Sequence, residues 1–208
     1  MLNKNLLLIP LIFFASLSLG KNYEISINFE SGFEYQSQKQ FIESIKLSKS
    51  SKEIEHLIDD QDWIKNYSIR YKPFKKEVFI NIKNREPIFV LNEMYFYDRD
   101  LNKFNFDHSK KDLIMVEGPI DDLRQVIKLI NVVESTTLSQ FKINNINYSY
   151  VNGWDVKSNN TLIRFGKELT KKKFNNYHET VNYLFEISKI PSIIDVRYKD
   201  GVALNYGK

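Results

Sequence analysis

The sequence contains no cysteine, and this absence excludes several kinds of chemistry at once. A disulfide framework, a thiolate metal site and a cysteine nucleophile all need a side chain that the 208 residues lack. Histidine is also scarce: His56, His108 and His178 lie far apart, and none has a second histidine at helical spacing. We therefore expect no metal centre and no cofactor.

Sequence motifs for catalysis are missing as well. The chain has 7 glycines, and they form neither a phosphate-binding loop nor a Gly-x-Ser-x-Gly elbow. Acidic residues cluster between Asp59 and Asp62 and again at Asp121 and Asp122, but these are ends of expected helices, where the helix dipole accounts for them. Lysine is spread along the whole chain, so the net charge of +4 forms no basic segment. We expect no enzyme, no nucleic-acid partner and no small-molecule substrate.

Aromatic and β-branched residues are abundant instead. The 15 Phe and 12 Tyr, together with many Ile and Val, favour a strand-rich fold over a helical bundle. A chain of 208 residues suffices for one large domain or two small ones. Segments that alternate in hydrophobicity are interspersed with helical stripes, so the sequence predicts an α+β fold.

One apolar stretch stands apart at the N-terminus. The chain from Leu6 to Leu19 is uncharged and mostly apolar, and Lys4 precedes it. At about 1.5 Å per residue, roughly fourteen residues extend about 21 Å, which is shorter than the roughly 30 Å hydrocarbon core of a bilayer. This length is typical of the apolar region of a signal peptide.

Two interpretations of this stretch stay open. Ser18 and Gly20 form a small-x-small pattern of the kind that precedes a cleavage site. Alternatively, residues 6–20 form a short transmembrane anchor behind a cytoplasmic tail of residues 1–5, with flanking lysines reaching the headgroups. In both interpretations the body of the chain lies outside the cytoplasm.

Residues 21–87 show a change of period that predicts a β-α-α-β-β order. Alternation from Tyr23 to Phe29 indicates a half-buried strand, and two helical stripes follow it. Ser50 and Glu53 have the spacing of a capping box at the start of the second helix. Two further alternating strands then run to Pro87.

Residues 88–208 read mainly as strands. Two strands joined by a polar turn come first, then a third strand and a helix from about Ile120 to Ser135. Three alternating strands follow, and a helix near Thr170 to Ser188 precedes a last strand-like run from Ile193. The sequence thus predicts a β-rich domain whose last strand-like run is either the final strand of a closed core or an open C-terminal edge strand.

The order β-α-α-β-β is that of a POTRA domain, and short motifs make the resemblance specific. The run DWIKNYSIRYKPFKKEVFINIKNREP resembles the end of the POTRA domain in the FtsQ/DivIB cell-division family. A tryptophan strand, a polar turn and a strand ending in Phe165, Gly166 and Lys167 follow in that family's order. The terminal IDVRYKDGVAL is similar to its motif VD-(L/M)-RY-x-(N/S)-G-x-A-V, and the whole resemblance covers residues 23–206.

The resemblance implies a non-catalytic, single-pass scaffold of the bacterial inner membrane. It implies a POTRA domain over residues 21–87 and an FtsQ-type β-domain over residues 88–208, both in the periplasm at the division septum. Members of this family bind the division proteins FtsB and FtsL and link early and late components of the divisome. Their last strand is an exposed edge that a segment of FtsB extends by β-strand addition.

The same resemblance implies which residues bind the partner. Most of them lie in the terminal segment, and Lys167 supplies a cation for an acidic partner residue. The full set is Lys167, Arg197, Tyr198, Asp200, Gly201 and Tyr206. We expect the partner strand to add at the backbone edge near residues 197–201.

Two features of the terminal segment stay open at this stage. Val196, Val202 and Leu204 are expected in the core, and Tyr198 is a candidate for the core as well as for the site. Asp200-Gly201 is a signal for a hairpin, so the segment is either one bulged strand or two short strands.

A second function from another class also stays open. The chain is alternatively a POTRA-containing periplasmic chaperone or a component of outer-membrane assembly and transport. Such proteins commonly carry serial POTRA units or a large barrel, and 208 residues leave room for neither.

Overall fold

The computed structural model describes residues 23–30, 35–105, 112–135 and 141–207, and the predicted tail and membrane segment lie outside these ranges. The fold is α+β, as predicted, and the chain divides into two compact units between Asn84 and Arg85. Within the described ranges, no helix has the length and apolar character needed to cross a bilayer.

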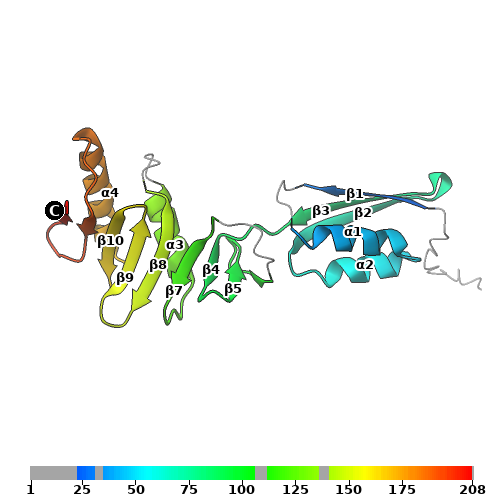
Figure 1. The fold of residues 1–208 in the computed structure, drawn as a ribbon, viewed down its shortest axis with the longest axis horizontal. Coiled ribbons are helices and arrows are strands. Elements are labelled where there is room, and N and C mark those ends of the chain that lie inside the picture. The colour runs from blue at the N-terminus through cyan, green and yellow to red at the C-terminus, as the bar shows by residue number, and fades with distance from the viewer. Residues whose placement is uncertain (1–22, 31–34, 106–111, 136–140, 208) are drawn as a thin grey trace, which may run out of the picture. The chain divides into compact units, whose positions relative to one another are not determined.

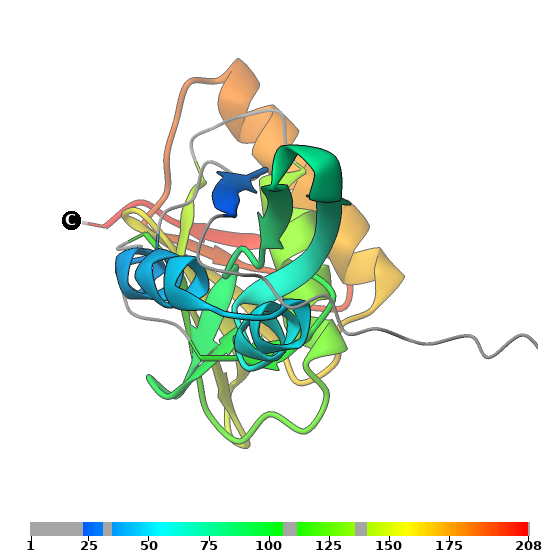
Figure 2. The same cartoon turned by 90° about the vertical axis from the view of Figure 1, so that its right-hand side faces the viewer.

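The first unit packs two helices on a three-stranded sheet (Figures 1 and 2). Its strand order is β1-β3-β2, with β1 parallel and β2 antiparallel to the central β3. Its elements are β1 (Glu24–Phe29), α1 (Gln38–Leu47), α2 (Ser51–Asp59), β2 (Ile64–Lys72), the 3₁₀ turn η1 (Pro73–Lys75) and β3 (Glu77–Asn84). The predicted β-α-α-β-β order is therefore confirmed.

The core of this unit follows from the two hydrophobic periods. Alternate residues of β3 (Val78, Ile80 and Ile82) are fully buried, because the central strand of the sheet lies beneath the helices. Trp63 is buried in this core, and its ring stacks on that of Tyr35 at 5.0 Å between centroids.

The start of α2 bears out half of the predicted capping box. The Ser50 hydroxyl accepts a hydrogen bond from the Glu53 backbone N–H at 3.2 Å, as an N-cap does. The Glu53 carboxylate, however, accepts from the backbone N–H of Lys49 at 2.7 Å and not from that of Ser50. The reciprocal bond is thus shifted by one residue.

The second unit is built on a nine-stranded sheet of order β12-β11-β10-β9-β8-β7-β4-β5-β6. Its strands are β4 (Phe89–Leu91), β5 (Tyr95–Tyr97), β6 (Lys103–Phe104), β7 (Ile114–Glu117), β8 (Ile143–Ser149), β9 (Gly153–Ser158), β10 (Thr161–Gly166), β11 (Ile193–Asp195) and β12 (Ala203–Asn205), and its helices are α3 (Arg124–Glu134) and α4 (Lys171–Glu186). The segment from 88 to 105 holds three strands, not the expected two, because an early turn breaks it after β4.

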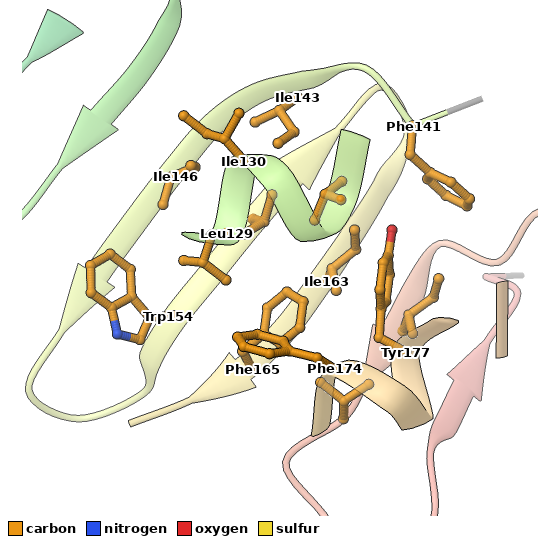
Figure 3. Close-up of a cluster of buried hydrophobic side chains, with 14 of the residues drawn as sticks. Leu129, Ile130, Phe141, Ile143, Ile146, Trp154, Ile163, Phe165, Phe174 and Tyr177 are labelled. Carbon is orange, nitrogen blue, oxygen red and sulfur yellow. The ribbon is translucent and has the colours of Figure 1, made fainter. Parts of the chain in front are cut away.

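Both helices of this unit bury their apolar faces in one core with the sheet (Figure 3). Leu129 and Ile130 of α3 and Phe174 and Tyr177 of α4 lie over inward-facing residues of β8, β9 and β10. Tyr177 is fully buried and its ring packs 5.6 Å from that of Phe165. Strand residues of the opposite parity, such as Asp155 and Arg164, lie on the other face of the sheet.

The predicted start of α3 at Ile120 is wrong. Residues 120–123 are not helical, and the helix begins at Arg124. The Asp122 carboxylate accepts from the Arg124 backbone N–H at 3.1 Å and pairs with its guanidinium. These local bonds between Asp122 and Arg124 hold the chain just before the helix in a non-helical conformation.

Candidate binding site at the C-terminal edge of the sheet

The last residues of the chain form a hairpin at one edge of the nine-stranded sheet. β12 runs antiparallel to β11, and β11 lies parallel to β10. The connection covers residues 196–202, so the two-strand alternative for the terminal segment holds. The expected position of the edge is therefore wrong: residues 197–201 form the turn, and the edge backbone is that of Ala203–Asn205.

Hydrogen bonds to β10 fix which way the backbone of β11 faces. Leu162 N–H donates to the Ser192 carbonyl, and Val196 N–H donates to the Arg164 carbonyl, both at 2.9 Å. Because successive strand residues face opposite sides, residues 192, 194 and 196 direct their backbone groups toward β10.

The free edge follows from this alternation. Ile193 and Asp195 direct their backbone groups toward β12, where they stand opposite Asn205 and Ala203. Leu204 lies between these two and directs its N–H and C=O away from β11. These groups face no further strand within the described sheet, and an added strand would begin its hydrogen bonds at Leu204.

Buried side chains hold this hairpin in place. Val196 is fully buried, and Val202 and Leu204 pack partly buried against the main core. The expectation that these three residues lie in the core is confirmed for Val196, whereas Val202 and Leu204 lie at the border of the core. Tyr198, by contrast, is 56% exposed, which removes it from the core.

Arg197 is bound within the hairpin. Its guanidinium donates to both Asp195 carboxylate oxygens, at 2.9 Å from Nε and 2.6 Å from Nη2, and its backbone N–H donates to the same carboxylate at 3.1 Å. Burial opposes ionisation of Asp195, but these hydrogen bonds outweigh it and hold the pKa of that carboxyl below its usual value. Arg197 therefore shapes the turn, with only part of its side chain facing solvent.

A row of alternating charges continues from this pair across the sheet. Arg164 on β10 stands between Asp155 on β9 and Asp195 on β11. The Arg164 Nε lies 3.8 Å from an Asp155 carboxylate oxygen, too far for a hydrogen bond. Burial raises the pKa of Asp155, and Arg164 and Arg197 only partly offset this effect. This row of alternating charges stabilises the register in which β9, β10 and β11 pair.

The turn places two more predicted residues on the surface. Asp200 forms an exposed ion pair with Lys172 at the start of α4, at 3.1 Å. Gly201 is exposed, and a Cβ added there would meet no atom within 4 Å. The fold itself does not require glycine at this position.

A groove of about 630 Å³ runs between α4 and the hairpin, next to the free edge. Its α4 wall carries Asn176, Thr180 and Tyr183, and its hairpin wall carries Val202 and Leu204. Tyr183 is 55% exposed although it is aromatic. A strand added at β12 would thus have a partly apolar surface beside it for its side chains.

Tyr206 directly follows β12, at the end of the strand away from the turn, and is 48% exposed. The Lys189 ammonium sits 5.7 Å from its ring centroid, and the Asn205 carboxamide accepts from the Gly207 backbone N–H at 2.8 Å. The hairpin therefore has an exposed tyrosine at each end, Tyr198 and Tyr206, with the free backbone of Leu204 between them.

The structure separates Lys167 from this edge. Its side chain lines a smaller pocket of about 160 Å³ with Tyr148, Tyr150 and Trp154. Gly166, its neighbour, approaches Arg197, since a Cβ there would lie 3.1 Å from the Arg197 Cγ. Lys167 is thus adjacent to the Arg197 end of the hairpin but faces a different pocket.

Several residues of the edge were not predicted from the sequence. Asn176, Thr180 and Tyr183 form a second stripe at helical spacing on α4, beside the apolar stripe that was used. An exposed tyrosine in such a stripe was the available signal. The ion pair of Lys172 with Asp200 joins distant parts of the chain, and the contact of Asp195 with Arg197 depends on the turn between them. No rule of sequence spacing therefore indicates either contact.

The comparisons with known proteins leave the family open. No protein-family model matches the chain, and no curated protein is similar enough to match. Across the described residues, no group of three or more His, Asp and Glu side chains is arranged to hold a metal ion, and His108 falls outside them. The site is defined by its backbone edge and its groove.

Proposed function

We propose that this chain is a non-catalytic scaffold of bacterial cell division of the FtsQ/DivIB type. In this proposal the first unit is a POTRA domain, the second is an FtsQ-type β-domain, and residues 6–20 anchor the chain in the inner membrane with its body in the periplasm. The partners are FtsB and FtsL, with which the chain links early and late divisome proteins at the septum.

One observation carries the proposal: β12 is an edge strand whose central residue, Leu204, directs its backbone groups away from its only partner strand in the described sheet. A β-strand from FtsB would pair there, and main-chain hydrogen bonds would supply most of the affinity. The groove beside α4 and the exposed tyrosines at both ends of the hairpin would select the partner's side chains.

A proline substitution tests this edge directly. Leu204→Pro removes the outward N–H but keeps the pairing of β12 with β11, because proline is tolerated on the free side of an edge strand. Leu204→Val is the matched control, since it changes the side chain and retains the N–H. We expect the proline variant to lose copurification with FtsB while the valine variant retains it.

A thermal melt of each variant separates binding from folding. The proposal requires that Leu204→Pro melts as a folded protein and yet fails to bind. Normal FtsB binding by a folded Leu204→Pro variant would contradict strand addition at this edge. If instead the chain copurifies with outer-membrane assembly proteins, the chaperone and transport alternative is the better function.

A further inference from the structure

The tip of the β2–β3 hairpin exposes an aromatic ring that the core does not use. β2 ends at Lys72, η1 covers Pro73–Lys75, and Lys76 adopts a left-handed conformation with φ 53°. Phe74, in the middle of this turn, is fully exposed at 104%. Such a side chain at the tip of a hairpin extends beyond the rest of the sheet edge, where a second surface can reach it.

Lysines surround this ring. Lys72, Lys75 and Lys76 are all exposed, and Lys72 is held over the Phe79 ring at 4.3 Å and near the Glu77 carboxylate at 3.7 Å. No ion pair of Lys75 or Lys76 occurs with another described residue.

The turn itself carries more lysines than acidic residues. Residues 72–77 contain Lys72, Lys75 and Lys76 but one carboxylate, that of Glu77, so their formal net charge is +2 (three cations minus one anion). Glu24 stands opposite Glu77 at the start of β1, and counting it with the turn leaves a net charge of +1 (three minus two).

The hairpin tip lies beside the start of the first strand. The Glu24 backbone N–H donates to the Lys76 carbonyl at 2.8 Å. In the sequence, only residues 21–23 separate Glu24 from the expected anchor, residues 6–20. Four extended residues span at most about 14 Å, so anchoring of residues 6–20 would hold the tip at the bilayer surface.

We propose that this hairpin tip is a membrane contact that docks on anionic phospholipid. Phe74 enters the interface between headgroups and acyl chains, and Lys75 and Lys76 bind the phosphate groups around it. A single aromatic with two cations binds a bilayer weakly by itself, but the nearby anchor raises its local concentration at the surface. The contact would limit how the first unit tilts on the membrane. This inference rests on the membrane anchor of the proposed function.

The absence of cysteine makes a site-specific test simple. Phe74→Cys in the full chain is labelled with an environment-sensitive nitrobenzoxadiazole dye and reconstituted into vesicles of phosphatidylcholine and phosphatidylglycerol. Lys83→Cys is the matched control, because Lys83 is exposed on the same hairpin, six residues beyond Glu77 and roughly 20 Å further along β3.

We expect the dye at position 74, and not at position 83, to emit at shorter wavelength and to be quenched by nitroxide-labelled lipid. Adding Lys75→Glu should lower the docked-to-free ratio by about fivefold per unit of charge changed, and high salt or pure phosphatidylcholine should remove this difference.

Flotation of the vesicles distinguishes a failure of the hairpin contact from a failure of the membrane anchor. A chain that floats with the vesicles while the dye at position 74 remains in a water-like environment overturns the hairpin contact and leaves the anchor intact. A chain that does not float overturns the anchor, and with it the contact. FtsB binding at β12 is measured separately and is independent of both results.

Discussion

Arg197 and Asp195 form a two-residue clasp in which one carboxylate accepts from the guanidinium and from the backbone N–H of the same arginine. The clasp lies at the start of the connection from β11 to β12, on either side of the buried Val196. An ion pair inside the hairpin thus holds the chain where it leaves β11 toward the proposed binding edge.

Substitution of Asp195 by Asn should destabilise the second unit at neutral pH. The native pKa of Asp195 is lowered, so its stabilisation is present above the unfolded value of about 3.9 and is lost as the pH falls through the native pKa. We expect a loss of roughly 1 to 3 kcal/mol at pH 7 for the charge-assisted hydrogen bonds. Urea unfolding of both proteins between pH 7 and pH 2 measures it.

The direction in which the stability difference changes with pH tests whether the charge of Asp195 is responsible for it. The difference between wild type and Asp195→Asn should shrink toward acid, because the wild-type carboxyl becomes protonated there. A difference that stays constant down to pH 2 would mean that the clasp contributes through packing alone.

Tyr198 should contribute to binding and not to stability. Its side chain is more than half exposed, so Tyr198→Ala should change the free energy of unfolding by no more than about 0.5 kcal/mol. If it anchors the partner, its loss should weaken FtsB binding by tenfold or more. Calorimetric titration of the variant with an FtsB peptide gives the affinity.

Val196→Ala is the matched control for this substitution. Val196 is fully buried two residues earlier, so its truncation should cost roughly 2 kcal/mol of stability. The two variants should therefore show opposite patterns. Equal losses of stability would place Tyr198 in the core after all.

The turn at Asp98 gives a prediction far from the binding edge. Asp98 is 3% exposed, and its carboxylate accepts from the backbone N–H groups of Asp100 and Asn102 and from Arg85. Asp98→Ala should destabilise the second unit by roughly 2 to 4 kcal/mol, because these donors lose a charged acceptor. Asp121→Ala, which removes an exposed carboxylate of the same unit, should have little effect. Thermal unfolding of both variants checks the contrast.

The sequence predicted those parts of the fold that depend on local periodicity and capping. α4 begins after Thr170, whose hydroxyl accepts from the Lys173 backbone N–H, and its apolar stripe enters the core as expected. α3 was predicted too early because the Asp122 carboxylate favours a turn over a helical start. A residue such as Asp122, which lies between a turn and a helix, does not change the hydrophobic periodicity, so the periodicity cannot locate the first residue of the helix.

The candidate site was predicted less completely than the fold. The six residues transferred by resemblance include Tyr198 and Tyr206, which lie at the two ends of the hairpin, but also Lys167, which faces a separate pocket. The clasp to Asp195 and the outward direction of the Leu204 backbone depend on strand pairing. Pairing is set by the whole sheet, and the residues in one strand do not reveal it.

Substitution by alanine should destabilise the second unit at one glycine, Gly153, and have almost no effect on stability at another, Gly201. A Cβ at Gly153 would lie 2.1 Å from the Gly166 carbonyl carbon, and Gly153 has φ +75°, so Gly153→Ala brings both a backbone clash and conformational strain. We expect it to destabilise the second unit by roughly 3 kcal/mol or more. A Cβ at Gly201 meets nothing within 4 Å, so Gly201→Ala should leave the melting temperature nearly unchanged.

Binding then reveals why position 201 is glycine. If a partner backbone approaches there, Gly201→Ala should weaken FtsB binding although the free protein is as stable as wild type. Calorimetric titration with an FtsB peptide and a thermal melt on the same samples give both quantities. Unchanged affinity of Gly201→Ala would place the partner strand nearer Tyr206 and Leu204, away from the turn, because only there could it pair with β12 without passing over Gly201.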